Sequence, residues 1–167
     1  MSQAFRAELV RLAPKLRRFA LSLCGNQSDA DDLVQAALER ALRNPDAFRE
    51  GTRLDSWMYR IVQNLFLDDR RRTRVRGEAV DPEDANLSDA GRGAAEPVDR
   101  LTLDQVRAAM DRLPEAQRIT LSLVAIEGLS YREAAEAMDV PLGTVMSRLA
   151  RARGALAPLM AAHGRRQ

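Results

Sequence analysis

The chain has 167 residues, 46% hydrophobic and 30% charged, which suits one soluble globular domain or two small ones. No segment approaches the roughly 18 uninterrupted apolar residues of a membrane span, and the N-terminus has no signal-peptide core. We therefore expect a cytoplasmic protein without membrane insertion. Since the chain has one cysteine, Cys24, and one histidine, His163, the sequence predicts no disulfide, metal or cofactor and no Ser-His-Asp site.

The net charge is only +2, but it is unevenly divided along the chain. Residues 1–75 carry 14 basic and 10 acidic side chains, residues 76–100 carry 3 and 7, and residues 101–167 carry 9 and 7. Two mildly basic blocks thus flank an acidic strip. Any affinity for nucleic acid must come from local patches, or from a larger complex that holds the chain in place.

The first predicted helix is long and amphipathic. Apolar residues recur at steps of four and three from Phe5 to Leu23, and Gly25 is placed to end the helix. Cys24 is then most simply a small buried residue at the end of this helix.

A second helix is predicted to follow, with Ser28 as its N-cap and with carboxylates in its first turn, where they favour the positive end of the helix dipole. These carboxylates belong to Asp29, Asp31 and Asp32. Asn44 and Pro45 are expected to close the helix.

The third predicted helix begins near Leu54 or Asp55 and ends in the charged run at residues 68–72, with an apolar line of Trp57, Ile61 and Leu65. Three arginines stand near Trp57, and four more lie between positions 70 and 74. Arginine binds phosphate and aromatic faces accept unstacked bases, so this segment suits a nucleic-acid strand. The spacing nevertheless favours Trp57 as chiefly a core residue, with only its edge near a ligand.

Residues 76–100 are rich in Gly, Pro, Asp, Glu and Ala, and they hold no aromatic residue. Such a segment cannot bury enough apolar area to offset its ordering entropy, which predicts a flexible acidic linker. Helices are then expected over residues 102–112 and from Glu115 to about Glu127, with Gly128 as a terminator. No strand pattern of useful length occurs, so both halves are expected to be all-α.

The stretch from Leu129 to Leu156 indicates a helix-turn-helix. Ser130 is expected to cap the first helix, with Glu133 three residues later completing a capping box. Small residues let the second helix pack closely, the connection at 138–140 is short, and Pro141 suits the first turn of the next helix.

The second helix of this unit presents two stripes at about 100° per residue. The apolar stripe consists of Val145, Leu149, Ala152 and Leu156, and the polar stripe of Thr144, Ser147, Arg148, Arg151 and Ala155. The polar stripe offers hydroxyls and guanidiniums to a DNA major groove. The alternative is an ordinary amphipathic hairpin with a solvated arginine face.

The sequence gives little support to an enzyme. Asp31 and Asp32, like Asp68 and Asp69, are adjacent on helices, so the two carboxylates of each pair diverge instead of converging on a substrate.

Taken in order, the segments SDADDLVQAALERAL, LDSWMYRIVQNLFLDDRRR, the acidic linker and DRLPEAQRITLSLVAIEGLSYREAAEAMDVPLGTVMSRLARAR resemble the extracytoplasmic-function (ECF) group of bacterial RNA polymerase sigma factors. The resemblance extends over about 140 residues. It implies an all-α chain of two small helical domains: a region 2-like domain at 1–75, a flexible linker at 76–100 and a region 4-like helix-turn-helix domain at 101–163. It also implies a non-enzymatic specificity subunit that binds core RNA polymerase and directs promoter recognition, for a stress-responsive or envelope- or environment-responsive regulon.

The family also implies roles for individual residues. The second helix resembles the part that docks on the clamp helices of the polymerase β′ subunit, and the C-terminal domain resembles the part that sits on the β flap. An anti-sigma factor is expected as a further partner, from the family alone. The residues that match the clamp-binding motif are Asp32, Leu33, Gln35 and Arg40.

The loop at 50–56 and the helix after it resemble the element that captures a flipped base of the promoter minus-ten element. The candidate minus-ten readers are Arg53, Ser56, Trp57, Arg60, Asn64, Arg70, Arg71 and Arg72. The helix-turn-helix resembles the reader of the duplex minus-thirty-five element. The candidates there are Arg132, Thr144, Ser147, Arg148 and Arg151.

One departure from the family pattern concerns Met146, which stands where the family usually has Lys or Arg. Met146 flanks the polar stripe, so DNA binding is expected to persist with one contact fewer and an altered sequence preference.

Two other classes of protein compete with a sigma factor. The first is an adaptor that mimics a sigma factor and sequesters an anti-sigma protein. Such mimics lose the DNA-contacting residues, whereas Arg148, Arg151 and the cluster at 70–72 are present here, and they carry a receiver domain, of which the sequence shows no βα pattern. The second is a free-standing repressor. A repressor of this kind would give residues 1–75 no function, and the sequence shows no evident dimerisation helix.

Overall fold

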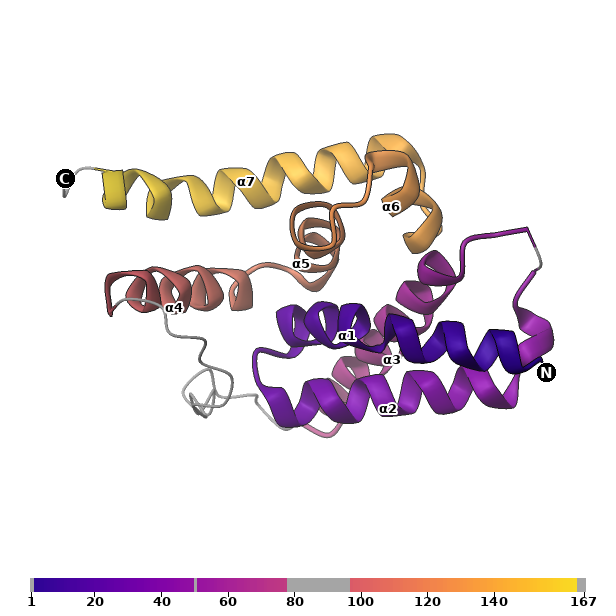
Figure 1. Cartoon of the computed structure of the whole chain (residues 1–167). Helices are drawn as coiled ribbons and strands as arrows, with labels where there is room; N and C mark the ends of the chain where they lie inside the picture. The colour runs from indigo at the N-terminus through magenta and orange to yellow at the C-terminus, as the bar shows by residue number, and fades with distance from the viewer. Residues whose placement is uncertain (1, 50, 78–96, 165–167) are drawn as a thin grey trace.

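The computed structural model describes residues 2–49, 51–77 and 97–164, and all regular structure in these ranges is helical (Figure 1). The first group of helices comprises α1 (Gln3–Cys24), α2 (Gln27–Arg43) and α3 (Leu54–Val75). The second comprises α4 (Pro97–Asp111), α5 (Glu115–Leu121), α6 (Tyr131–Met138) and α7 (Leu142–Gly164). Short turns of other helix types cover Pro45–Ala47 and Ser122–Ile126. The all-α prediction, with two small helical domains, is thereby confirmed.

Residues 78–96 of the predicted linker lie outside the described residues. Helix α4 begins at Pro97, so its first turn falls within the segment that the composition assigns to the linker.

Helix α1 agrees with the sequence prediction. Leu9, Leu16, Phe19 and Leu23 are buried, and the helix ends against Gly25, whose backbone adopts a left-handed φ of 78°. The Gly25 N–H donates to the carbonyl of Leu21, a helix-ending bond that a left-handed glycine permits without steric cost.

Helix α2 starts earlier than the sequence suggested. Its N-cap is Asn26, whose side-chain oxygen accepts a hydrogen bond from the N–H of Asp29 at 2.9 Å. Ser28 lies inside the first turn, so the prediction that Ser28 caps the helix was wrong. Asn and Ser are comparably good caps, and only the extended backbone at Asn26 decides between them.

Helix α3 differs from the prediction in two ways. Its buried line is Leu54, Met58, Tyr59, Val62 and Phe66, whereas Trp57, Ile61 and Leu65 are only partly buried. The core line is therefore turned by about one residue from the predicted one. The helix also continues through the arginine run to Val75 instead of ending at 68–72.

The second group begins with helix α4, and α5 continues into a π-helical turn that ends before Gly128, whose φ is 72°.

The predicted capping box of α6 is confirmed. The Ser130 hydroxyl accepts from the N–H of Glu133, and the Glu133 carboxylate accepts from the N–H of Ser130.

The predicted apolar stripe of α7 is also confirmed. Val145, Leu149 and Ala152 are at most 1% exposed, and Leu156 packs partly against the same core. Helices α4 and α7 contact each other along one side of the domain, with the π-helical turn, α5 and α6 between α7 and the first group (Figure 1).

The two groups of helices pack against each other, with α3 contacting α6 and α1 contacting α5 and the π-helical turn. Arg118 of α5 joins them, since its side chain, 3% exposed, donates to the carbonyl of Leu23 in α1 and to that of Met110 in α4. Carbonyls at a helix carboxyl end favour a cation. Burial lowers the pKa of Arg118, and the negative charge of Asp111 opposes this shift.

The reassigned cap of α2 can be tested by mutation. We expect Asn26→Ala to lower the free energy of unfolding by about 1 kcal/mol, because it leaves the N–H of Asp29 without its side-chain acceptor. Ser28→Ala is the matched control and should change it little, since Ser28 is exposed within the helix. Urea unfolding followed by circular dichroism measures both, and the reverse ranking would restore Ser28 as the cap.

Candidate nucleic-acid interface

The polar stripe of α7 faces away from the core. Ser147 and Arg151 are exposed, and Thr144 and Arg148 are half-buried beside the turn between α6 and α7. The Arg148 guanidinium lies 4.0 Å from the sulfur of Met138 at the carboxyl end of α6, which leaves this side chain half-buried. These four residues share one face of a straight helix, which is the geometry that major-groove reading requires.

Two neighbours complete this face. Arg132 is exposed on α6, the helix that precedes the turn. Met146 is 52% exposed and projects beside the stripe, where it adds apolar surface but no charge.

The candidate minus-ten residues differ in their surroundings, and the first three lie at the contact with the second helical group. The Arg60 guanidinium donates to the carbonyls of Ala137 and Glu136 at the carboxyl end of α6. Arg53 binds both Asp55 and Glu133. The hydroxyl of Ser56 is buried without a hydrogen-bond partner in the described part of the chain.

Asn64, Arg71 and Arg72 are instead exposed on α3. Arg71 makes only a 3.7 Å ion pair with Asp68 one turn away, which is weak at such an exposed site. Arg70 has a different setting, because its guanidinium lies 5.5 Å from the ring centroid of Phe66 and 4.0 Å from Glu115 of α5.

Trp57 lies among aromatic residues. Its ring is 6.3 Å from Phe5 and 5.4 Å from Phe48, measured between centroids, in tilted contacts. The side chain is partly buried at the edge of the core. This position agrees with the expectation that Trp57 is chiefly a core residue.

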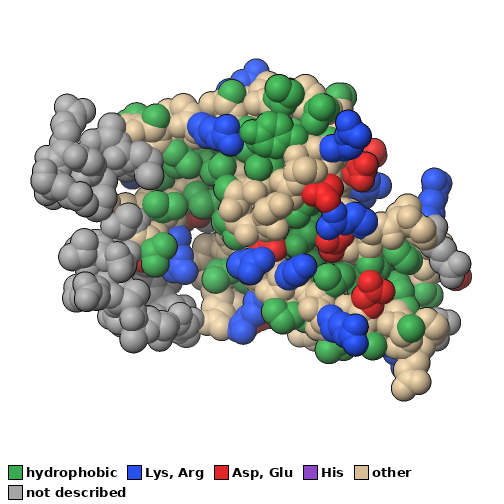
Figure 2. Space-filling model, turned by 45° about the horizontal axis from the view of Figure 1, so that its top comes forward, with side chains coloured by type: hydrophobic (Ala, Val, Ile, Leu, Met, Phe, Trp, Pro, Cys, Tyr) green, Lys and Arg blue, Asp and Glu red, His purple; other side chains and the backbone are tan. Residues whose placement is uncertain are grey.

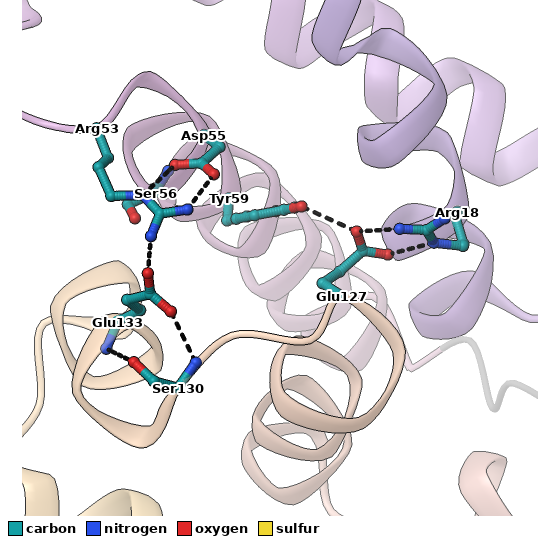
Figure 3. A network of polar contacts seen from close by, with 8 residues as sticks. All are labelled: Arg18, Arg53, Asp55, Ser56, Tyr59, Glu127, Ser130 and Glu133. Atoms are coloured by element: carbon teal, nitrogen blue, oxygen red, sulfur yellow. Dashed lines mark hydrogen bonds and ion pairs between the residues drawn. The ribbon is translucent and has the colours of Figure 1, made fainter.

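A cluster around Glu127 lies between the two helical groups (Figure 3). The Glu127 side chain is 0% exposed and accepts two hydrogen bonds from Arg18 of α1 and one from the Tyr59 hydroxyl of α3, each 2.9 Å long. Burial, followed by the bond to Glu127, raises the pKa of Tyr59, so the phenol stays protonated as a donor. Sequence reasoning missed this cluster, because no local pattern links residues 18, 59 and 127.

The candidate polymerase-binding residues belong to α2, the helix farthest from α7 in Figure 1. Asp32, Gln35 and Arg40 are exposed, and Leu33 packs partly against the core. An apolar groove of about 1020 Å³ between α1 and α2 runs beside Gln35. A polar helical face beside an apolar groove is suited to docking a helical partner.

Basic side chains form no continuous surface on the face shown in Figure 2; they stand in separate groups, several beside acidic ones. No group of three or more residues among His, Cys, Asp and Glu could hold a metal ion in the described ranges. Within the same ranges, no helix is both long and apolar enough to cross a membrane.

The chain matches two family models in sequence order. Residues 9–76 match Sigma-70 region 2, and residues 103–156 match Sigma-70 region 4. The two matches correspond to the two helical groups and define a sigma factor that has regions 2 and 4.

Comparison with individual proteins shows which kind of sigma factor the chain resembles. The chain is 39% identical to the ECF RNA polymerase sigma factor EcfG of Rhodopseudomonas palustris, over 98% of this chain and 89% of that protein. The structure of the sigma factor RpoE with the anti-sigma factor NepR, from Bartonella quintana, matches with a TM-score of 0.74 and 32% identity, covering 96% of this chain and 98% of that one. The chain belongs to the ECF family of RNA polymerase sigma factors, the subunits that direct the polymerase to promoters.

A likeness of fold extends to another protein. A structure of the anti-anti-sigma factor PhyR with NepR, also from Bartonella quintana, matches with a TM-score of 0.64 and 21% identity, covering 93% of this chain but 50% of that one. At this identity only the fold is shared.

The state of Cys24 gives a chemical test of the packing at the carboxyl end of α1. Burial, followed by the charge of Asp29, raises the pKa of this thiol to about 12. Because the thiolate is the reactive form, we expect alkylation by iodoacetamide at neutral pH to be slow in the folded protein and fast in denaturant. Mass spectrometry measures both rates, and fast alkylation of the folded chain would mean that this end of α1 is open.

Proposed function

We propose that the chain reads promoters through two separate surfaces and joins the polymerase through a third. Helix α7 reads the minus-thirty-five element, α3 reads the minus-ten element, and the outer face of α2 binds the β′ clamp helices. Region 2 and region 4 correspond to residues 1–75 and 101–163, and the acidic segment that precedes α4 is the flexible tether between them. The exposed polar stripe of α7 carries the proposal most directly.

The minus-thirty-five assignment rests on chemistry and orientation. Ser147 and Arg151 stand free of the core on the same side as Thr144 and Arg148. Arginine binds guanine edges or phosphates in the major groove, and hydroxyl groups bind either. Arg132 lies beside the turn, where a phosphate of the same duplex would pass.

The minus-ten assignment rests on the donors gathered along α3. Asn64, Arg71 and Arg72 are exposed and suited to the backbone and bases of a single strand. Arg53, Ser56, Arg60 and Arg70 would join them when region 4 moves away, and the edge of Trp57 would support the flipped base.

Two DNA-binding surfaces that are each weak bind DNA more tightly together when the polymerase holds both of them in place. Each contact then becomes intramolecular and acquires a high effective concentration. This explains how a chain of net charge +2 acts on DNA only within the holoenzyme. We also infer that the chain has no catalytic activity of its own and acts in the cytoplasm. Region 4 would contact the β flap of the polymerase. The genes that it controls would form a stress-responsive or environment-responsive regulon.

An anti-sigma factor is the further partner that we propose. The support is the likeness to RpoE, whose structure is a complex with the anti-sigma factor NepR. A second candidate is an adaptor that binds an anti-sigma protein, because PhyR, which shares the fold, is an anti-anti-sigma factor. The exposed Arg151 and Ser147 favour the sigma factor, since an adaptor has no use for a DNA-reading face.

The minus-thirty-five surface can be tested with a control on the same helix. Arg148→Ala or Arg151→Ala should weaken promoter binding through the upstream element by about 1–3 kcal/mol. Arg153→Ala removes the same charge from another side of α7, where Arg153 contacts the Tyr131 hydroxyl, and should have little effect. Binding of reconstituted holoenzyme to a promoter selected from a randomised library measures this. Equal losses from all three variants would refute the assignment of this face.

The polymerase-binding surface needs a separate test. Changing Asp32 and Gln35 together to alanine should weaken binding to core polymerase about tenfold or more, equivalent to about 1.4 kcal/mol or more, while the chain stays folded. Asp46→Ala is the control, because it removes the same charge from the exposed turn that follows α2. Titration of labelled chain with core polymerase gives the affinities. Undiminished binding by the double variant would show that α2 is not the docking helix.

A further inference from the structure

An apolar row runs along α7 beside the polar stripe. Leu142, Met146 and Ala150 stand four residues apart, and all three are exposed, Met146 to 52% and Leu142 to 43%. Residues at this spacing lie one above the other on the same side of a helix. None of the three side chains is charged or can donate a hydrogen bond, so the row offers apolar contact and little else.

The neighbouring row of α7 is polar. Ser147 and Arg151 follow Met146 and Ala150 by one residue each, which turns them about 100° around the helix, and both are exposed. The two rows therefore form adjacent halves of one outward face. A duplex seated against the polar half lies within reach of Met146, whose side chain is long and flexible.

The space in front of this face is open. Gly143 lies between the two rows, and a Cβ built on it would meet nothing within 4 Å in the described part of the chain. Packing of the helix is carried by other residues, since Val145 and Leu149 are buried while Met146 is not. A lone exposed methionine is ordinary on a protein surface, so it is the position of Met146 beside the polar row that points to a ligand.

The major groove of DNA presents an apolar group at one of the four bases. Thymine carries its C5-methyl group there, whereas the other three bases present hydrogen-bond donors and acceptors. Lys or Arg, which the family usually has where this chain has Met146, binds phosphate or a guanine edge. The thioether of methionine makes neither contact well, and it packs favourably against a methyl group.

We propose that Met146, supported by Ala150, contacts the C5-methyl group of a thymine in the minus-thirty-five element and gives the protein a preference for thymine at that position. Leu142 lines a shallow depression with Arg132 and Pro141, so it lies at the turn and forms the outer end of the row. The inference rests on the proposed role of α7. It adds one base that this chain selects, in place of the phosphate or guanine contact of a basic residue.

The test removes the methyl group from the DNA and the thioether from the protein in turn. Reconstituted holoenzyme is bound to the promoter selected from a randomised library, and each thymine of the upstream element, on either strand, is replaced by deoxyuridine. Deoxyuridine differs from thymidine only by the missing C5-methyl group. At one thymine, the replacement should weaken binding by the wild type about fourfold, as expected for the loss of one buried methyl-sized group.

Variants at position 146 show whether this side chain makes the contact. Met146→Ala should bind the thymine promoter about fourfold more weakly and should no longer distinguish thymine from deoxyuridine at that position. Met146→Leu keeps a large apolar side chain and should keep most of the preference. Because Met146 is exposed, neither substitution disturbs the core.

Leu103→Ala is the matched control, since Leu103 is an apolar residue of α4 with a similar exposure of 57%. It should leave the ratio of thymine to deoxyuridine binding as in the wild type. Equal binding of the two promoters by wild-type holoenzyme, at every thymine of the upstream element, would overturn the proposal. So would a preference that persists in Met146→Ala, because the methyl group would then act through the shape of the DNA.

The variants Arg148→Ala and Arg151→Ala separate this inference from the proposed function. If either weakens binding through the upstream element while deoxyuridine has no effect, α7 reads the element and only the thymine contact is refuted. If neither differs from Arg153→Ala and deoxyuridine has no effect, the role of α7 itself is refuted, and the contact of Met146 with it.

Discussion

The arrangement of this protein depends on a carboxylate that one domain buries and the other neutralises. Glu127 belongs to region 4, and both of its side-chain donors, Arg18 and Tyr59, belong to region 2. A small helical domain has a limited core, so docking against its neighbour contributes much to its stability. Arg118 adds a second polar link, from α5 to the carboxyl end of α1. These polar contacts lie beside an apolar core that the two helical groups share.

The packing within and between the two domains bears on how a sigma factor functions. Apolar stripes such as Val145, Leu149 and Ala152 keep each domain intact, and the contacts between the domains combine hydrogen bonds with apolar packing in one shared core. In this structure α3 is partly covered while the faces of α2 and α7 are exposed.

Predictions from the sequence succeeded where the signal was local and failed where two local signals competed. The capping box of Ser130 and Glu133 and the helix end at Gly25 each need only a few neighbouring residues, and both are confirmed. Asn26 and Ser28 are similar caps two residues apart, and sequence reasoning chose the wrong one. On α3 the apolar line was misplaced by one residue, because Trp57 is large and apolar yet packs at the edge against Phe5 and Phe48.

The sequence by itself determined the existence of the helices, the apolar stripes of α1 and α7, the polar face of α7 and the family. These follow from periodicity, caps and motif order, which act over a few turns of chain. Only the tertiary structure decided which predicted DNA-reading residues are free. Arg53 and Arg60 resemble Arg71 and Arg72 in sequence, yet the first two are bound by α6 and the last two are exposed. The physical reason is that the partners of Arg60 are backbone carbonyls 76 and 77 residues away, and every residue of a chain carries such an acceptor.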